Sequence, residues 1–84
     1  MVTVKVFGTI RLDTGIKEMK ADVGDVKSLY PLLLKQAKQN RPAANVTAAD
    51  FGGCLVFVNG VQAKKSTKLQ DGDSVMLMSP VSGG

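Results

Sequence analysis

One stretch of this chain carries a helical pattern, and strand-like segments lie on both sides of it. Its apolar residues recur at the spacing that places side chains on one face of a helix: Val26, Leu29, Leu33 and Ala37. A chain of 84 residues is long enough for one domain with one hydrophobic core. We therefore expect residues 1–84 to form a single α+β domain, in which one main helix packs across a mixed sheet of about five strands.

The start of this helix depends on the residue that caps it, because Pro31 lies near its beginning. With Asp25 as the cap, Pro31 falls beyond the first turn and removes a backbone hydrogen bond. With Ser28 as the cap, Pro31 takes the third helical position, where its missing N–H costs little. We expect either a kink at Pro31 or a helix that starts late.

The N-terminal segment has the two-residue period of a half-buried strand, since valine alternates with polar residues over positions 2–6. The pattern predicts that this strand runs on toward Ile10 and Leu12. Asp13-Thr14-Gly15 then supplies a turn. A second strand over residues 16–21 should pair antiparallel with the first, because so short a connection allows nothing else.

The middle of the chain combines a long loop with a buried strand. Residues 39–53 are rich in turn-forming residues, which predicts a loop with a helical turn near residues 48–51. The run from Cys54 to Val58 is almost continuously apolar, as in a central strand that is covered on one or both faces.

Two turn signals organise the C-terminal third. Asn59-Gly60 suits the positive φ angles of a type I′ turn, so residues 61–63 should return as a short strand. Asp71-Gly72-Asp73 predicts a turn that starts a final strand over residues 74–78, and Pro80 should end that strand. A hairpin, a helical crossover and later strands fit a β-grasp architecture, in which the first and last strands lie parallel at the centre of the sheet.

The net charge of +4 permits an anionic partner without identifying one. The denser basic groups are Lys35, Lys38 and Arg41, where the helix should end, and Lys64, Lys65 and Lys68, in a loop. Favourable interaction with a helix C-terminus explains the first group, and a solvated loop explains the second. Nucleic-acid binding is disfavoured, because few aromatic residues accompany the basic ones.

The residue inventory disfavours several further chemistries. With no histidine and a single cysteine, the chain cannot form an internal disulfide, and neither a zinc site nor histidine-based acid–base catalysis is expected. Cys54 itself is expected to be an inert strand residue. The sequence has no signal peptide and no apolar run of membrane-spanning length, so we expect a cytoplasmic protein with no membrane partner.

The sequence ends in Gly83-Gly84, which indicates a chemical handle. Glycine has no Cβ, so two glycines form a thin, flexible tail that can enter a narrow active site and present a terminal carboxylate. The reacting atom would be the carboxyl carbon of Gly84.

These elements together resemble the ubiquitin-like sulfur carriers, the superfamily of the molybdopterin synthase small subunit (MoaD) and the thiamine-biosynthesis sulfur carrier (ThiS). The resemblance covers a first strand from Val4 to Arg11, the segment Phe57-Val58-Asn59-Gly60, the segment Leu69-Gln70-Asp71-Gly72-Asp73 and the ending Ser79-Pro80-Val81-Ser82-Gly83-Gly84. Its ending and its length look more like the molybdopterin synthase subunit than the shorter thiamine carrier.

The resemblance implies a carrier without an active site or bound cofactor of its own. A ubiquitin-activating-type adenylyltransferase would use ATP to adenylate the Gly84 carboxylate, and sulfur from a donor would then displace AMP to leave a thiocarboxylate. A tail threaded into the partner's site would bring the carboxyl group into position for attack. Within that tail, Gly83 would pass the point where a Cβ clashes most, Pro80 and Val81 would limit the tail's entropy, and Ser82 would complete it.

By the same resemblance, the exposed sheet face would dock on the activating enzyme or on the large synthase subunit. The residues at the contacting positions are Phe7, Arg11 and Met78. The flexible side chain of Met78 suits an interface that must meet two partners in turn.

Three other interpretations stay open. The sulfur could serve the thiamine pathway instead of molybdopterin biosynthesis. The chain could be a ubiquitin-like modifier, which passes the adenylated Gly84 to a lysine amine. It could also be a plain binding module in which the diglycine has no chemical role.

Overall fold

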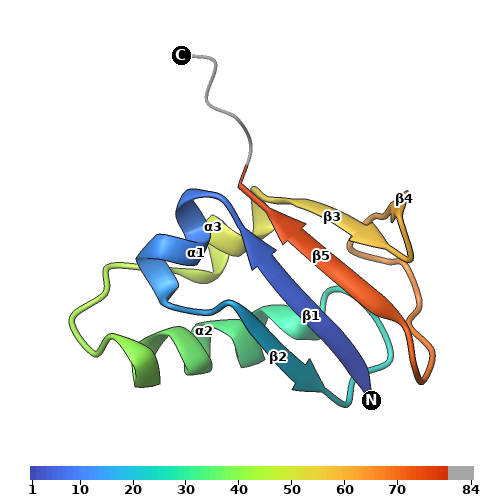
Figure 1. Cartoon of the computed structure of the whole chain (residues 1–84), viewed down its shortest axis with the longest axis horizontal. Coiled ribbons are helices and arrows are strands. Elements are labelled where there is room, and N and C mark those ends of the chain that lie inside the picture. The colour runs from blue at the N-terminus through green and yellow to red at the C-terminus, as the bar shows by residue number, and fades with distance from the viewer. Residues whose placement is uncertain (80–84) are drawn as a thin grey trace.

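The computed structural model describes residues 1–79. It contains the strands β1 (Val2–Phe7), β2 (Glu18–Ala21), β3 (Leu55–Val58), β4 (Val61–Gln62) and β5 (Ser74–Met78), and the helices α1 (Thr9–Thr14), α2 (Leu29–Asn40) and α3 (Ala48–Gly52). The five strands form one sheet in the order β2-β1-β5-β3-β4. β1 and β5 pair in parallel at its centre, and the remaining pairs are antiparallel (Figure 1). The predicted β-grasp fold is confirmed.

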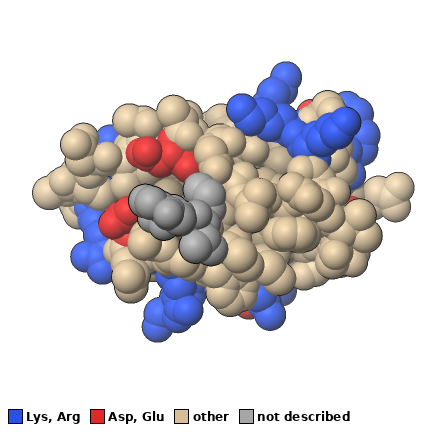
Figure 2. All heavy atoms as spheres, turned by 90° about the horizontal axis from the view of Figure 1, so that it is seen from above, with Lys and Arg blue, Asp and Glu red and all other residues tan. Residues whose placement is uncertain are grey.

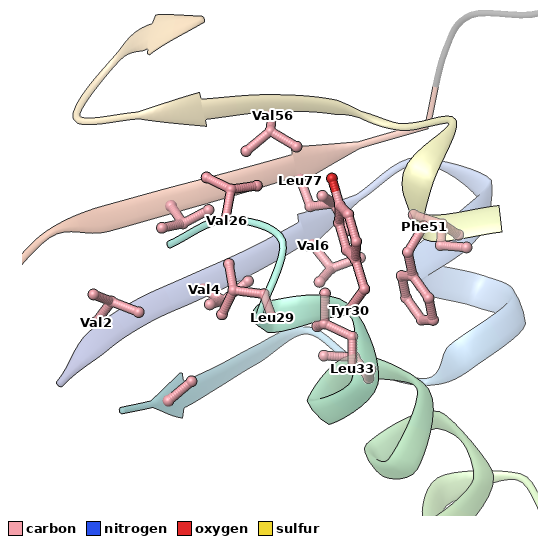
Figure 3. Close-up of a cluster of buried hydrophobic side chains, with 14 of the residues drawn as sticks. Val2, Val4, Val6, Val26, Leu29, Tyr30, Leu33, Phe51, Val56 and Leu77 are labelled. Carbon is pink, nitrogen blue, oxygen red and sulfur yellow. The ribbon is translucent and has the colours of Figure 1, made fainter. Parts of the chain in front are cut away.

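The core lies between one face of this sheet and α2 (Figure 3). Alternate residues of β1 and β5 point to this face and are at most 1% exposed: Val2, Val4, Val6, Val75 and Leu77. The helices contribute Leu29, Leu33, Ala37 and Phe51, each fully buried. Because a strand points successive side chains to opposite faces, the intervening residues of β1 and β5 lie on the other, open face of the sheet.

The first strand ends at Phe7, so the prediction that it continues toward Ile10 and Leu12 is wrong. Gly8 has a φ of 84°, which takes the backbone out of the strand conformation, and α1 begins at Thr9. In a strand, the side chains of Ile10 and Leu12 would share one face, but in a helix they point to different sides. Ile10 is accordingly 5% exposed, whereas Leu12 is 71% exposed.

The pairing of β1 with β2 is antiparallel as predicted, but the connection is not a tight hairpin. Asp13 and Thr14 are the last residues of α1, and Gly15 follows with a φ of 71° as the left-handed cap of that helix. The buried hydroxyl of Thr14 donates to the carbonyl of Ile10 at 2.7 Å and accepts from the amide of Ile16 at 3.2 Å. These bonds fix the turn between α1 and β2. β2 starts at Glu18, two residues later than predicted.

The main helix, α2, starts late, which resolves the two alternatives for Pro31. Ser28 occupies the N-cap position, so Pro31 is the third helical residue. The hydroxyl and the amide of Ser28 both donate to the carboxylate of Asp25, and these bonds lower the pKa of Asp25. Asp25 therefore stabilises the turn before α2 and is not the N-cap residue of this helix.

Both predicted turns of the C-terminal third are present. Asn59 and Gly60 have φ angles of 52° and 84°, as a type I′ turn requires. The Asp73 carboxylate accepts from the Gln70 amide at 2.8 Å and from the Asn59 side-chain amide at 3.0 Å. Those two bonds lower the pKa of Asp73 and join the two turns at the point where β5 begins.

The structure confirms the helical turn and the strand predicted for the middle of the chain and shifts the start of the strand by one residue. The helical turn expected near residues 48–51 is α3, and Asp50 closes a capping box with Thr47 at its start. β3 begins at Leu55, one residue later than predicted. It is covered on one face only, because Val56 is 5% exposed and Leu55 is 39% exposed.

Candidate functional site

The tail that carries the predicted chemistry lies outside the described residues: Pro80, Val81, Ser82, Gly83 and Gly84. The last residue that the structure describes is Ser79, which directly follows β5. Because β1 and β5 are parallel, they end at the same edge of the sheet, where Phe7 lies opposite Met78. This edge, from which the tail continues, is the centre of the candidate site.

Ser79 is held at this edge by two hydrogen bonds. Its amide donates to the carbonyl of Phe7 at 3.3 Å, which extends the β1–β5 pairing by one step. Its hydroxyl accepts from the amide of Ile10 in the first turn of α1 at 2.7 Å. Gly8, the N-cap of that helix, has no side chain to accept this bond. Ser79 therefore caps α1 from a distant part of the sequence.

Gly8 is what allows Ser79 to come so close. A Cβ on Gly8 would lie 3.0 Å from the Cβ of Ser79, too near for an ordinary contact, and the φ of 84° would strain any other side chain. The bend at Gly8 after β1 and the position of Ser79 before the tail therefore depend on each other.

The open face of the sheet carries an apolar stripe, which we define as Phe7, Leu55, Phe57, Met76 and Met78. The strand register makes Met78 the neighbour of both Phe7 and Leu55, and Met76 the neighbour of Phe57. Leu55 is exposed, and the other four are half-buried. Apolar side chains gathered on an uncovered sheet face are typical of a surface that binds another protein.

The sequence analysis named Phe7 and Met78 but missed the rest of the stripe. Leu55 and Phe57 alternate with buried Val56, and Met76 precedes buried Leu77. Once β1 and β5 are placed at the centre of the sheet, a two-residue period is enough to assign all three to the open face.

Arg11 was predicted to lie on the exposed sheet face with Phe7 and Met78, but it is not part of the apolar stripe. It lies in α1 rather than in a strand, because the first strand stops at Phe7. Its side chain is half-buried, and its carbonyl accepts a hydrogen bond from the amide of Gly15 at 2.9 Å. The stripe brings Phe7 and Met78 together without Arg11, whose partner contact stays a prediction.

Cys54 lies just before β3 and is half-buried. Burial and the nearby Asp50 raise the pKa of its thiol, and the thiol donates to the backbone carbonyl of Asp50 at 3.3 Å. A raised pKa keeps the sulfur protonated at neutral pH, which disfavours a nucleophilic role.

No group of three or more metal-ligating side chains is found among residues 1–79. In the same range, no helix has the length and apolar content that crossing a membrane requires.

The contact between Ser79 and α1 can be tested by substitution. Ser79→Ala removes the hydroxyl that caps the amide of Ile10, and a lost cap of this kind costs about 1 kcal/mol of unfolding free energy. Urea denaturation measures that loss. Ser66→Ala is the matched control, because Ser66 is exposed and no side-chain hydrogen bond of it is found within residues 1–79. Equal midpoints for the two variants would refute the capping role.

The model of the ThiS family matches residues 4–84. A search of curated proteins found no match. Several solved structures are similar over nearly the full length of this chain. SAMP1 from Haloferax volcanii is 23% identical with a TM-score of 0.71, covering 99% of this chain and 98% of that chain.

A putative molybdopterin converting factor subunit 1 from Pyrococcus furiosus is 24% identical with a TM-score of 0.68, covering 95% of this chain and 97% of that chain. A chain in the complex of subunits 1 and 2 of molybdopterin-converting factor from Helicobacter pylori is 26% identical with a TM-score of 0.63, covering 99% of this chain and 97% of that chain. These likenesses agree with the β-grasp fold. Since the family model spans all but the first three residues, the chain belongs to the ThiS family.

Proposed function

We propose that this protein is a sulfur carrier that bears sulfur as a thiocarboxylate on Gly84 and supplies it to molybdopterin biosynthesis. The observation that carries the proposal is the ThiS family match, which runs through Gly83-Gly84 at the end of the sequence. Two features of residues 1–79 support this proposal. Ser79, which precedes the tail, is held by its bond to Ile10, and the apolar stripe lies beside Ser79 on the open sheet face.

The chemistry requires an activated carboxyl group. An oxygen of the Gly84 carboxylate attacks the α-phosphorus of ATP on the activating enzyme, and pyrophosphate leaves. The resulting acyl adenylate is a good electrophile. Sulfide attacks its carbonyl carbon while AMP leaves, which gives the thiocarboxylate directly. With a persulfide donor the product is an acyl disulfide, and a second thiol must then cleave its S–S bond, which releases the thiocarboxylate and leaves a disulfide with the donor. Two glycines present no Cβ to the walls of a narrow active site, so the carbonyl can reach the position for attack.

In this proposal the chain acts as a carrier rather than as an enzyme. ATP belongs to the activating enzyme, and the chain holds no cofactor besides the sulfur itself. The protonated thiol of Cys54 agrees with this, because a thiol with a raised pKa is a poor nucleophile for the acyl adenylate.

Two partners would use the apolar stripe in turn: first a ubiquitin-activating-type adenylyltransferase, then a synthase large subunit. The similar chain in the Helicobacter pylori structure forms a complex of subunits 1 and 2, which supports a second partner of that kind. Met76 and Met78 at the centre of the stripe have flexible, polarizable side chains that can pack against two different surfaces.

Protein modification is the second candidate. The fold is also that of SAMP1 from Haloferax volcanii, a small archaeal modifier protein. A modifier forms the same acyl adenylate, but a lysine amine finally attacks the carbonyl, so the product is an amide linkage instead of a thiocarboxylate. Gly84-dependent, lysine-linked conjugates in a cell extract would favour this candidate. A thiamine-pathway carrier would differ only in the acceptor of the sulfur.

Removal of Gly83 and Gly84 separates function from folding. We expect the shortened protein to lose all stimulation of ATP–pyrophosphate exchange by the activating enzyme, while its thermal midpoint stays at the value of the full chain, because the core is built from residues within 1–79. Ser66→Ala, which alters an exposed residue outside the tail and keeps the diglycine, is the control. Exchange that persists without the diglycine, or a large drop in the midpoint, would contradict the proposal.

Charge placed on the docking surface should weaken the complex. Met78→Asp, in the apolar stripe, is expected to raise the dissociation constant for the activating enzyme about tenfold, because it sets an uncompensated charge in the proposed interface. Arg11→Glu tests the predicted partner contact of Arg11 outside the stripe and is expected to weaken binding by a similar factor. Calorimetry measures the constants. The control is Leu32→Asp on α2, a partly exposed leucine away from the open sheet face. If Met78→Asp binds as tightly as Leu32→Asp, the docking surface lies elsewhere.

A further inference from the structure

A groove with a volume of about 890 Å³ opens between α1 and the segment that precedes β3. Its walls come from α1, from residues 41–46 and from α3. Ser79 also lines it, so the groove reaches the place where the described chain ends. The apolar stripe is separate from it, since none of the stripe's five residues lines the groove.

The lining of the groove includes two buried apolar side chains and one exposed apolar side chain. Ile10 and Val46 are 5% and 7% exposed, whereas Leu12 on α1 is 71% exposed. Burying a leucine side chain on folding is favourable, so a leucine left in water contributes little to the stability of this chain. Within residues 1–79, no neighbouring side chain covers it to any large extent.

Two carboxylates line the same groove, although the chain as a whole carries a net charge of +4. Asp50 already closes the capping box of α3. Asp13 makes no ion pair and no side-chain hydrogen bond within the described part of the chain, and it lies in the last turn of α1, where a negative charge is unfavourable. Arg41 also lines the groove and forms no ion pair with either carboxylate in that part.

The face that contains the end of β5 carries both acidic and basic side chains. Acidic side chains gather in the left half of this face, while lysine and arginine lie toward its rim (Figure 2). With two carboxylates and one guanidinium in its lining, the groove has an excess of negative charge on a positive molecule. Such a groove selects a partner by charge, because like charges placed opposite each other cost free energy while opposite charges steer the encounter.

We propose that this groove is a second docking site for the activating enzyme and receives from it a segment with a lysine or arginine next to a large apolar side chain. The inference rests on the proposed function, since Ser79 joins the groove to the start of the tail that the same enzyme must hold. The cation lies against Asp13, and the apolar side chain packs on Leu12, Ile10 and Val46. Contacts on the stripe and in the groove then hold the carrier at two separate surfaces, one beside Met78 and the other lined by Ser79.

The test uses the full-length chain and the adenylating enzyme of its native host, with dissociation constants from calorimetry. Leu12→Ser is expected to weaken binding about tenfold at every salt concentration, because it removes apolar contact area. Asp13→Lys is expected to weaken binding about tenfold at low salt, and this effect should shrink as salt screens the charge.

The chain offers a matched control for each change. Val61→Ser removes a side chain that is 70% exposed on β4, against 71% for Leu12. Asp22→Lys makes the same charge reversal as Asp13→Lys on an exposed residue that does not line the groove. Both controls should bind within twofold of the unaltered chain, and none of the four variants should lower its thermal midpoint.

The possible results separate this inference from the proposed function. If the unaltered chain stimulates ATP–pyrophosphate exchange but Leu12→Ser and Asp13→Lys bind like their controls, the groove is not a docking site while the carrier function stands. Self-association of the unaltered chain that Leu12→Ser abolishes would also overturn the inference, because a second copy would then be the occupant. Failure of the unaltered chain to stimulate exchange would count against the proposed function itself.

Discussion

The parallel pairing of β1 with β5 at the centre of the sheet is the interaction on which the rest of the structure depends. It buries alternate residues of both strands under α2 and turns the others to the open face. It also makes both strands end at one edge, so that Phe7, Met78 and Ser79 meet there from opposite ends of the sequence. The apolar stripe and the start of the tail are both consequences of this pairing.

The edge of the sheet owes its geometry to a glycine and a serine that no local pattern connects. Gly8 bends the chain out of β1 and leaves room for Ser79, whose hydroxyl accepts the bond from the first turn of α1. α1 in turn carries Leu12 and Asp13 to the groove. α1, a short helix that contributes few side chains to the core, thereby connects Ser79 to the groove. The groove differs from the apolar stripe because two carboxylates line it.

The sequence alone was enough for the elements whose signals are local. The Asn59-Gly60 turn follows from the φ angles that these residues tolerate. β5 has the predicted bounds because the Asp71-Gly72-Asp73 turn precedes it and Pro80 follows soon after it in the sequence. α1 was missed because Ile10 and Leu12 alternate like strand residues, and only the positive φ of Gly8 separates the two possibilities. The role of Ser79 could not be predicted, since its bond to Ile10 spans 69 positions of the chain.

The central claim is that Gly84 carries sulfur, and the mass of the intact protein tests it most directly. The protein should be purified from its native host under conditions that preserve thiocarboxylates, and fragments should locate any change along the chain. The account predicts a form in which one oxygen of the Gly84 carboxyl group is replaced by sulfur, and its loss when the activating enzyme is deleted. A terminus that stays an ordinary carboxylate while Gly84 is found in amide linkage to lysines of other proteins would contradict it.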